Sequence, residues 1–308
     1  MTALRSRRPP FSKKLRRSTK LASPRDYKNT IIPNWCPGCG DYGIQNAISA
    51  VCAKKGWANE DITLISGIGC SSRIGGYQYC YGAHTTHGRA LPFAQGIKCA
   101  NKDTHMIVCS GDGDSYAIGL GHAMHAMKRN MDITYLVFDN QVYGLTKGQT
   151  SPASSQGFVT KTTPDGNPMT PLDAPSMAIA AGATFVAQAY AIDGKNLVDI
   201  IEKAVDHKGF SYVNIFTPCV TFNHFNTVEW YNTHLKKISD VRESYDPTSK
   251  AQAFHLLAET DSLVTGVIYE ETGALPFGDI VPSKDIALVD YVEKPSQEVF
   301  DDLCKEFR

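Results

Sequence analysis

The sequence predicts an α/β protein with a doubly wound, mostly parallel sheet and a C-terminal extension. Short apolar runs rich in β-branched residues alternate with helical patterns along the first two-thirds of the chain. Strands that alternate with helices in this way pair in parallel and are covered on both faces. The 308 residues, 42% of them hydrophobic and 20% charged, are enough to bury a large core.

The expected elements follow one another in a regular order. Two buried strands come first, and a helix then leads into a third strand. The next segment, 146–171, is too long and polar for a plain connector, so we expect it to lie over a functional site. In chain order, the expected elements are strands at 62–65 and 106–109, a helix at 116–128, a strand at 133–138, a helix at 177–181, a strand at 184–189, a helix at 197–205, strands at 212–216 and 263–269, and a helix that ends near Phe307.

The chain divides into three expected parts. Residues 1–24 form a basic flexible arm, because they are rich in Lys and Arg and no acidic residue precedes Asp26. Two adjacent prolines interrupt any amphipathic helix in the arm, which argues against an organelle transit peptide. Residues 25–222 form the α/β domain, and residues 223–308 form an extension that packs on the same domain or on a partner subunit.

The composition excludes several functions. No stretch approaches the roughly twenty apolar residues of a membrane span, so we expect no membrane insertion. The formal net charge is zero and basic residues cluster only in the terminal arm, so we expect no nucleic-acid partner. Nine cysteines without a secretory signal favour a reducing compartment, and hence the cytoplasm.

Two polar turns follow neighbouring strands and suit a diphosphate with its cation. The strand at 106–109 runs into a Gly-Asp-Gly turn that contains Asp112, where glycines let a phosphate approach the backbone beside a helix N-terminus. The strand at 133–138 ends in a second turn, and ligands of such sheets bind at the carboxyl ends of strands. The Asp112 carboxylate, the Asn140 amide and the Val142 carbonyl would supply the hard oxygen ligands that Mg²⁺ prefers.

Other interpretations of these turns are weaker. A lone Gly-Asp-Gly turn is common, so the evidence lies in its spacing from the turn that carries Asn140. Zinc is disfavoured because no His or Cys stands nearby at a ligand spacing. A dinucleotide site is disfavoured because the strand is not followed by the Gly-x-Gly-x-x-Gly order.

Four cysteines at the ends of predicted elements form a candidate metal site. They are Cys36, Cys39, Cys70 and Cys219. Four thiolates bind either a tetrahedral zinc ion or a [4Fe-4S] cluster. Structural zinc usually draws on two close pairs, whereas one close pair and two distant single cysteines favour the cluster. We expect the others to be buried or structural thiols: Cys52, Cys80, Cys99, Cys109 and Cys304.

Five motifs stand out along the chain: Cys-Pro-Gly-Cys-Gly at 36–40, Gly-Ile-Gly-Cys-Ser-Ser at 67–72, His-Gly-Arg at 87–89, Gly-Asp-Gly-Asp at 111–114 and Asp-Asn-Gln-Val-Tyr-Gly-Leu-Thr-Lys-Gly-Gln at 139–149. In combination they resemble the β subunits of the 2-oxoacid:ferredoxin oxidoreductases, most closely the 2-oxoglutarate type. The resemblance covers about residues 25–300 and leaves the basic arm outside. It implies the thiamine diphosphate-binding form of the doubly wound fold.

The resemblance implies three cofactors and the residues that bind them. One [4Fe-4S] cluster is held by Cys36, Cys39, Cys70 and Cys219, and Mg²⁺ by Asp112, Asn140 and Val142. Thiamine diphosphate is surrounded by Ile68, Gly69, Cys70, Ser71, His87, Gly113, Asp114, Gly144 and Leu145. Without the resemblance, a satisfied loop histidine would be the preferred interpretation of His87.

The resemblance also implies a reaction and its partners. The enzyme would convert 2-oxoglutarate and coenzyme A to succinyl-CoA and CO₂, a reaction that could also run in reverse. Electrons would leave through the cluster to an external ferredoxin, because the chain lacks the dense cysteine run of a ferredoxin domain. Thiamine enzymes of this kind use a second α/β domain to activate the cofactor, so we expect an obligate α subunit and an α2β2 assembly.

The expected substrate rests on two cations. A dicarboxylate needs a cationic partner for its distal carboxylate, and Arg73 and Lys147 lie in two loops that flank the expected thiamine site. With His87, they are the candidate catalytic residues, although Arg73 could instead pair with a structural carboxylate. The alternatives are the same reaction on pyruvate or another 2-oxoacid and, in a different class, a non-catalytic metal-binding module.

Overall fold

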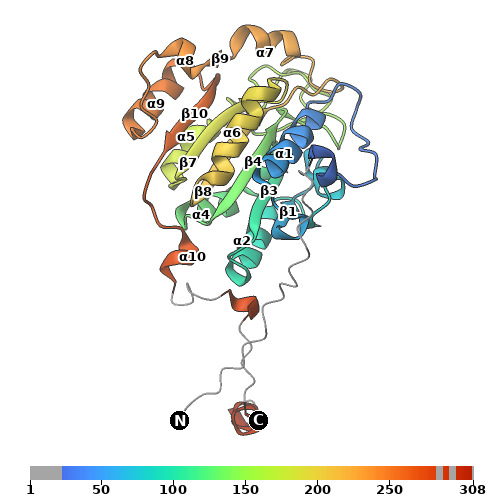
Figure 1. Cartoon of the computed structure of the whole chain (residues 1–308). Coiled ribbons are helices and arrows are strands. Elements are labelled where there is room, and N and C mark those ends of the chain that lie inside the picture. The colour runs from blue at the N-terminus through green and yellow to red at the C-terminus, as the bar shows by residue number, and fades with distance from the viewer. Residues whose placement is uncertain (1–22, 282–286, 291–295, 307–308) are drawn as a thin grey trace.

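The computed structural model describes residues 23–281, 287–290 and 296–306. An eight-stranded sheet forms its centre, with the strand order β2-β1-β3-β4-β8-β7-β10-β9 (Figure 1). A separate hairpin follows β4 along the chain and consists of β5 (Val142–Tyr143) and β6 (Gln149–Thr150). The strands of the large sheet are β1 (Ile62–Ser66), β2 (Tyr81–His84), β3 (His105–Gly111), β4 (Ile133–Asp139), β7 (Phe185–Tyr190), β8 (Phe210–Phe216), β9 (Lys236–Lys237) and β10 (Val264–Glu270).

The predicted fold class is confirmed. Every neighbouring pair from β2 to β7 is parallel, and β10 runs antiparallel to β7. The six predicted strands correspond to β1, β3, β4, β7, β8 and β10, with ends that differ by at most two residues. The edge strand β2 was not predicted, because its side chains are mostly exposed and form no apolar run.

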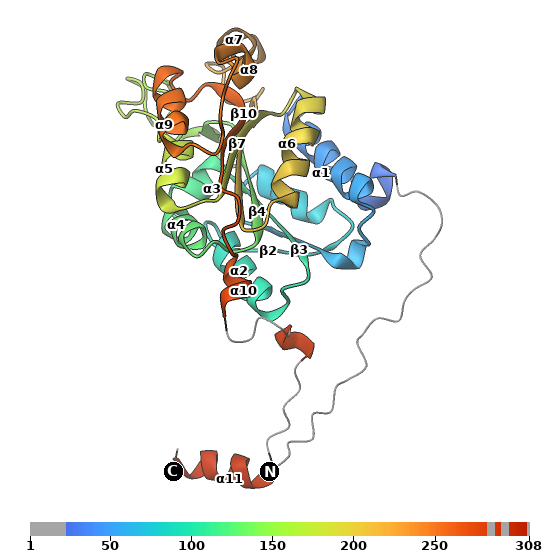
Figure 2. The same ribbon diagram turned by 60° about the vertical axis from the view of Figure 1, so that its left-hand side comes forward.

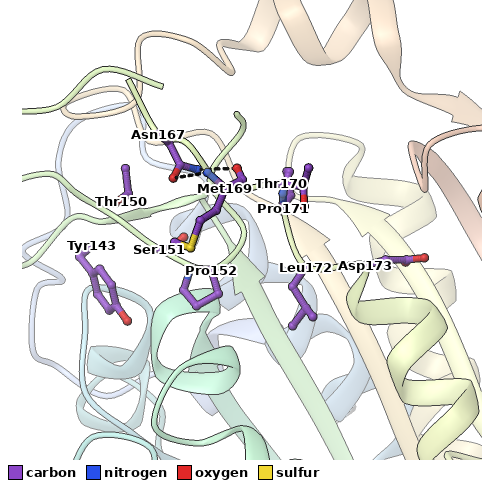
Figure 3. Close-up of a pocket in the computed structure, with 10 residues that line it drawn as sticks. All are labelled: Tyr143, Thr150, Ser151, Pro152, Asn167, Met169, Thr170, Pro171, Leu172 and Asp173. Atoms are coloured by element: carbon purple, nitrogen blue, oxygen red, sulfur yellow. Dashed lines mark hydrogen bonds between the residues drawn. The ribbon is translucent and has the colours of Figure 1, made fainter. Parts of the chain in front are cut away.

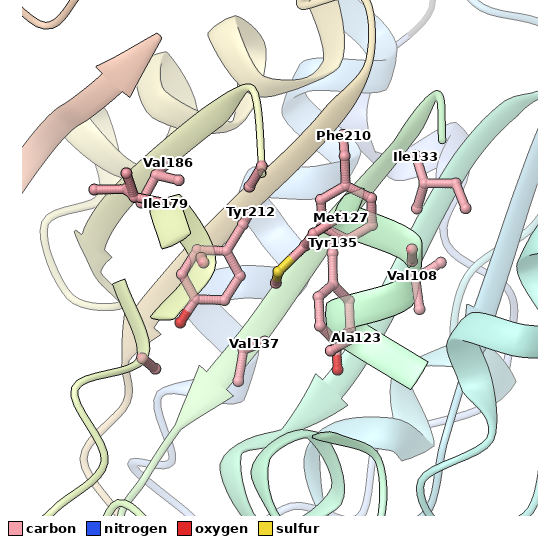
Figure 4. Close-up of a cluster of buried hydrophobic side chains, with 14 of the residues drawn as sticks. Val108, Ala123, Met127, Ile133, Tyr135, Val137, Ile179, Val186, Phe210 and Tyr212 are labelled. Carbon is pink, nitrogen blue, oxygen red and sulfur yellow. The ribbon is translucent and has the colours of Figure 1, made fainter. Parts of the chain in front are cut away.

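Helices cover both faces of the sheet (Figure 2). One face carries α1 (Asp41–Lys55) and α6 (Gly194–Asp206), and the other carries α2 (Ala90–Ala100), α4 (Leu120–Lys128) and α5 (Ala174–Ala181). Residues of β4 alternate between the two layers, because successive strand side chains point to opposite faces. Leu136 joins the core beneath α1 and α6, whereas Val137 joins the other core. Figure 4 shows this second core, with Val108, Val137, Tyr212 and Met127.

The helix expected at 116–128 is wrong in its extent. Helical structure begins four residues earlier as α3 (Asp112–Tyr116), and a break at 117–119 separates it from α4. A Cβ on Gly119 would lie 2.4 Å from the Asp114 carbonyl oxygen, and a Cβ on Gly88 would lie 2.7 Å from the Gly119 nitrogen. The break is therefore closely packed, both against the end of α3 and against the distant loop that carries Gly88. The helix that begins at the Gly-Asp-Gly turn is therefore α3, which has only five residues.

The C-terminal part of the chain enters the sheet through β10. Beside this strand, α9 (Lys250–Glu259) buries Ala253, Leu256 and Leu257 in the core. No helix among the described residues is long and apolar enough to cross a membrane. Most of the basic arm at 1–24, and the expected helix end near Phe307, lie outside the described residues. The remaining helices are α7 (Val228–His234), α8 (Ile238–Val241), α10 (Phe277–Ile280) and α11 (Gln297–Glu306).

Candidate active site

A narrow pocket lies at the carboxyl ends of β1, β3 and β4, where loops from distant parts of the chain meet. All nine residues expected around thiamine diphosphate line this pocket, and so do the three expected around Mg²⁺. Gly111, Tyr143 and Thr146 also line it and were not predicted. The full lining is Ile68, Gly69, Cys70, Ser71, His87, Gly111, Asp112, Gly113, Asp114, Asn140, Val142, Tyr143, Gly144, Leu145 and Thr146.

Asp112 places a buried carboxyl in this pocket. It is 1% exposed, and its Oδ2 accepts a hydrogen bond from the Ser151 hydroxyl. Burial, with the charge of Asp139 as the second cause, raises the pKa of Asp112 well above its ordinary range. Burial also raises the pKa of Asp139 to about 6, although the Asn214 amide donates to Asp139 Oδ2 at 3.0 Å and acts in the opposite direction. A divalent cation would stabilise two buried carboxyls of this kind.

The turn after β4 brings two further candidate oxygen ligands, the Asn140 amide and the Val142 carbonyl, to the same pocket. Asn140 Oδ1 accepts the Val142 amide at 3.2 Å, and Gln141 between them has a φ of 58°, in the left-handed region. From a distant loop, the Asn223 side chain donates to the Asn140 carbonyl at 3.1 Å and holds the turn in place. One carboxylate, one amide oxygen and one carbonyl are a donor set that fits Mg²⁺ with a diphosphate.

Asp114 joins two loops at the pocket. Its Oδ1 accepts the backbone amides of Gly88 at 2.6 Å and of Ile68 at 3.2 Å. A Cβ on Gly67 would lie 1.8 Å from Asp114 Oδ2, so only glycine fits there. His87 Nδ1 lies 3.7 Å from Asp114 Oδ1, and the imidazole is partly exposed. Asp114 therefore shapes the pocket through backbone contacts and keeps His87 at its edge.

Tyr143 is a lining residue that the sequence did not reveal. Its hydroxyl donates to the Gly113 carbonyl at 3.2 Å, and a Cβ on Gly113 would lie 2.2 Å from its ring. The second glycine of the Gly-Asp-Gly turn is thus required by the contact with this ring. The signal was hidden because the two residues lie thirty positions apart.

The four candidate cysteines approach one another beside the pocket. A Cβ on Gly144 would lie 3.5 Å from Cys70 Sγ and 3.9 Å from Cys219 Sγ. Burial is the main cause that raises the pKa of Cys70 to about 11, and the charges of Cys219 and Cys36 add to it. Burial likewise raises the pKa of Cys39, with a contribution from Cys219. Cys70 therefore lies near Cys36 and Cys219, and Cys39 lies near Cys219 and Cys70.

The four candidate cysteines do not form a site for a single metal ion. Within the described ranges, no three His, Cys, Asp or Glu side chains gather closely enough to hold one metal ion. A cluster places iron and sulfide between its thiolates, so its cysteines stand farther apart than those around one zinc ion. The four cysteines are therefore candidate ligands of a cluster rather than of one zinc ion.

Asp41 lies beside these cysteines and was also not predicted. It is fully buried, and neither carboxylate oxygen accepts an N–H or O–H hydrogen bond from the described residues. Burial raises the pKa of Asp41 to about 7, while the neighbouring Cys39 thiol acts against this shift. A buried carboxyl with so few partners is unusual and marks the region as a functional site.

The two cations expected to bind substrate lie outside the pocket lining. Arg73 is exposed in the 3₁₀ turn at Ser71–Gly76, and its Nε donates to the Tyr77 hydroxyl at 3.1 Å. Lys147 is exposed between β5 and β6, with a φ of 77°. Neither cation forms an ion pair with the part of the chain that the structure describes. The alternative that Arg73 serves a structural carboxylate therefore finds no support there.

A larger cavity of about 570 Å³ shares Tyr143 with the narrow pocket (Figure 3). Residues of the loop at 146–171 and the two residues before α5 form most of its lining. Ser151 belongs to this loop and donates to Asp112, so the loop reaches the candidate site as expected. The cavity itself has no Lys, Arg or His in its lining and offers no counter-charge for a phosphate or carboxylate.

The fold and the pocket define a thiamine diphosphate-binding enzyme. Residues 67–215 match the family model described as thiamine pyrophosphate enzyme, C-terminal TPP binding domain. Residues 219–285 match the C-terminal family model of the pyruvate ferredoxin oxidoreductase beta subunit. Together the two matches include β2 through β10, and the first match begins directly after β1.

Known proteins resemble the chain over most of its length. A 2-oxoacid:ferredoxin oxidoreductase subunit beta from Saccharolobus solfataricus is 44% identical over 219 residues, which cover 70% of this chain and 72% of that protein. The 2-oxoglutarate synthase subunit KorB of Archaeoglobus fulgidus is 42% identical over 214 residues, covering 69% and 79%. A solved 2-oxoglutarate:ferredoxin oxidoreductase from Magnetococcus marinus, with 2-oxoglutarate, coenzyme A and succinyl-CoA bound, superimposes with a TM-score of 0.83 at 36% identity, covering 92% of this chain and 96% of that chain.

The chain belongs to the family of 2-oxoacid:ferredoxin oxidoreductase β subunits, which confirms the resemblance seen in its motifs. It is therefore part of a thiamine diphosphate-dependent oxidoreductase. As a β subunit, it works with partner subunits of the same enzyme.

Proposed function

We propose that the chain is the β subunit of a 2-oxoglutarate:ferredoxin oxidoreductase, which forms succinyl-CoA and CO₂ from 2-oxoglutarate and coenzyme A. One observation carries the proposal: the loops after β1, β3 and β4 converge on a single pocket lined by every residue expected to bind thiamine diphosphate and Mg²⁺. The relatives named for 2-oxoglutarate support the choice of substrate. Pyruvate and other 2-oxoacids remain the alternative substrates of the same chemistry.

Asp112, Asn140 and the Val142 carbonyl would hold Mg²⁺ and, through it, the diphosphate. The charge of the cation would offset the cost of burying the Asp112 and Asp139 carboxyls. Bound thiamine diphosphate supplies a nucleophilic carbon and an electron sink for decarboxylation. Within the chain, Tyr143 narrows the pocket and limits water, and His87 is available at its edge to hold or release a proton.

Cys36, Cys39, Cys70 and Cys219 would ligate one [4Fe-4S] cluster that passes electrons to ferredoxin. Cys70 lines the thiamine pocket and its sulfur approaches the Cys219 sulfur near Gly144, which supports a short path between the two cofactors. An α subunit would complete the site, in an α2β2 assembly. The use of cysteines as ligands and buried thiols suits the cytoplasm.

Arg73 and Lys147 would bind the distal carboxylate of 2-oxoglutarate. Both are exposed and have no acidic partner among the described residues, so their charges are available to a ligand. An arginine offers a planar fork that matches a carboxylate, which favours Arg73 as the main contact.

The experiment is an anaerobic study of the complex purified with its α subunit. We expect visible absorption from a cluster, and bleaching by 2-oxoglutarate with coenzyme A that exceeds the bleaching by pyruvate. Stronger bleaching by pyruvate would make pyruvate, and not 2-oxoglutarate, the substrate of the enzyme. A complex that contains zinc but neither iron nor thiamine would instead favour the non-catalytic metal-binding module.

The Mg²⁺ assignment is tested by Asp112→Ala. We expect this variant to lose bound thiamine diphosphate, because the buried carboxylate is the charged ligand of the cation. Asp165→Ala is the control, since Asp165 is an exposed acid on the loop at 146–171. Retention of the cofactor by Asp112→Ala at wild-type affinity would contradict the assignment.

A further inference from the structure

The guanidinium of Arg73 is oriented by a tyrosine hydroxyl. Its Nε donates to the Tyr77 hydroxyl at 3.1 Å, and its other N–H groups have no hydrogen-bond partner within the described residues. The terminal fork of the guanidinium is the part that binds a carboxylate through two parallel hydrogen bonds. The contact at Nε therefore restrains the side chain and leaves its carboxylate-binding edge free.

The Tyr77 hydroxyl is itself fixed by further hydrogen bonds. It donates to Asn34 Oδ1 at 2.6 Å and accepts the Asn34 backbone amide at 3.3 Å. A tyrosine hydroxyl has one hydrogen to donate and two lone pairs, so with Arg73 its hydrogen-bonding capacity is filled. The hydroxyl has no freedom to turn away from Arg73 without losing one of these bonds.

The ring of Tyr77 is held equally firmly. Tyr77 is 5% exposed, and its ring meets that of Trp35 edge to face, with centroids 4.9 Å apart. The Trp35 indole donates to the Cys70 carbonyl at 2.7 Å. Trp35 and Asn34 therefore join the segment before Cys36 to the turn that carries both Cys70 and Arg73.

We propose that Tyr77 is a positioning residue that directs Arg73 to the distal carboxylate of the 2-oxoacid, and so sets the preference for dicarboxylic over monocarboxylic substrates. The proposal rests on one part of the proposed function, the binding of this carboxylate by Arg73. Arg73 contributes the positive charge. Because Tyr77 already restrains this long exposed side chain, Arg73 loses less conformational entropy when it binds the carboxylate.

The test compares kcat/KM for 2-oxoglutarate and for pyruvate in the anaerobic complex with its α subunit. Tyr77→Phe keeps the ring against Trp35 and removes only the hydroxyl. We expect it to raise KM for 2-oxoglutarate about three- to ten-fold with kcat nearly unchanged, the size expected for one hydrogen bond. The constants for pyruvate should change little, because that substrate has no distal carboxylate.

Tyr42→Phe is the matched control. Tyr42 also packs edge to face on Trp35, at 5.2 Å, and its hydroxyl donates to the Pro33 and Trp35 carbonyls without contacting Arg73. A general loosening of this segment would affect both tyrosine variants, whereas positioning of Arg73 predicts an effect of Tyr77→Phe alone.

Arg73→Gln tests the substrate-binding role of Arg73 separately from the positioning role of Tyr77. If Arg73→Gln keeps the preference for 2-oxoglutarate, the substrate role of Arg73 is wrong. If Arg73→Gln loses the preference and Tyr77→Phe keeps it, Arg73 binds substrate but the positioning role of Tyr77 is overturned. Positioning also predicts that Tyr77→Phe has no further effect in the Arg73→Gln background.

If the Tyr77→Phe complex loses the [4Fe-4S] cluster, Asn34→Ala provides a second variant. It removes the acceptor of the Tyr77 hydroxyl and leaves the hydroxyl in place. We expect a smaller loss of preference in the same direction, and an unchanged ratio of the two kcat/KM values would overturn the inference.

Discussion

Three of the buried carboxyls near the candidate site, those of Asp41, Asp112 and Asp139, have raised pKa values. Burial is the main cause that raises the pKa of each of them. A carboxyl whose pKa is raised on folding makes the folded chain less stable once the pH exceeds the pKa of the unfolded chain. We infer that these residues are present for cofactor binding, because a stability role would favour neutral side chains there.

Asp41 should give the iron-free chain a measurable pH dependence. Burial raises the pKa of Asp41 from 3.8 to about 7, so the folded chain binds more protons than the unfolded chain between these pH values. The free energy of unfolding should therefore fall as the pH rises, by up to about 1.4 kcal/mol per pH unit from this group.

Urea unfolding at several pH values between about 5 and 7 measures this dependence. Asp41→Asn should have a shallower slope than the wild type, and Asp61→Asn, which changes an exposed acid, should match the wild type. Equal slopes for Asp41→Asn and the wild type would show that Asp41 does not titrate in this range.

At the scale of elements, we expect the break between α3 and α4 to depend on Gly119 and not on the nearby Gly121. A Cβ on Gly119 would lie 2.4 Å from the Asp114 carbonyl oxygen, whereas a Cβ on Gly121 would meet nothing within 4 Å. We expect Gly119→Ala to lower the free energy of unfolding by about 1–3 kcal/mol through steric strain. Gly121→Ala should raise it by up to about 1 kcal/mol, because alanine favours the helix.

Chemical denaturation of the two variants measures both changes. Gly119→Ala should also weaken thiamine diphosphate binding, because Asp114 connects the break to the loops at Ile68 and Gly88. Similar stabilities for the two variants would mean that the close approach at Gly119 is relieved without cost.

At the scale of the whole molecule, the sheet brings together cysteines from three separate regions. Cys36 and Cys39 precede α1, Cys70 follows β1, and Cys219 follows β8. If they hold one cluster, Cys219→Ser should lower the iron content and visible absorption of the anaerobic complex even though Cys219 is distant in sequence.

Cys99→Ser is the matched control for the cluster. Cys99 is an exposed free thiol at the end of α2, and the variant should keep the iron content of the wild type. Equal iron in the two serine variants would exclude Cys219 as a ligand, and the cluster would then need another ligand.

Local sequence patterns were sufficient for much of the fold, and the family resemblance of the motifs supplied the candidate site residues. Buried strands such as β4 are continuous apolar runs, so their positions follow from composition over a few residues. The Gly-Asp-Gly turn and the turn that carries Asn140 each follow a strand, so their meeting at one edge follows from parallel pairing. For this reason every residue expected around the cofactor lines one pocket.

The tertiary structure alone decided the residues that support this site. Tyr143 against Gly113, Ser151 on Asp112, Asn34 on Tyr77 and the buried Asp41 have no short-range signal, because each acts through a contact between segments far apart in the sequence or through burial. The break at Gly119 likewise packs against Gly88, a residue of a distant loop. The sequence by itself determined most of the element types and the candidate ligand residues, which depend on neighbouring residues. Folding determined which side chains surround those candidates, because that depends on packing between distant parts of the chain.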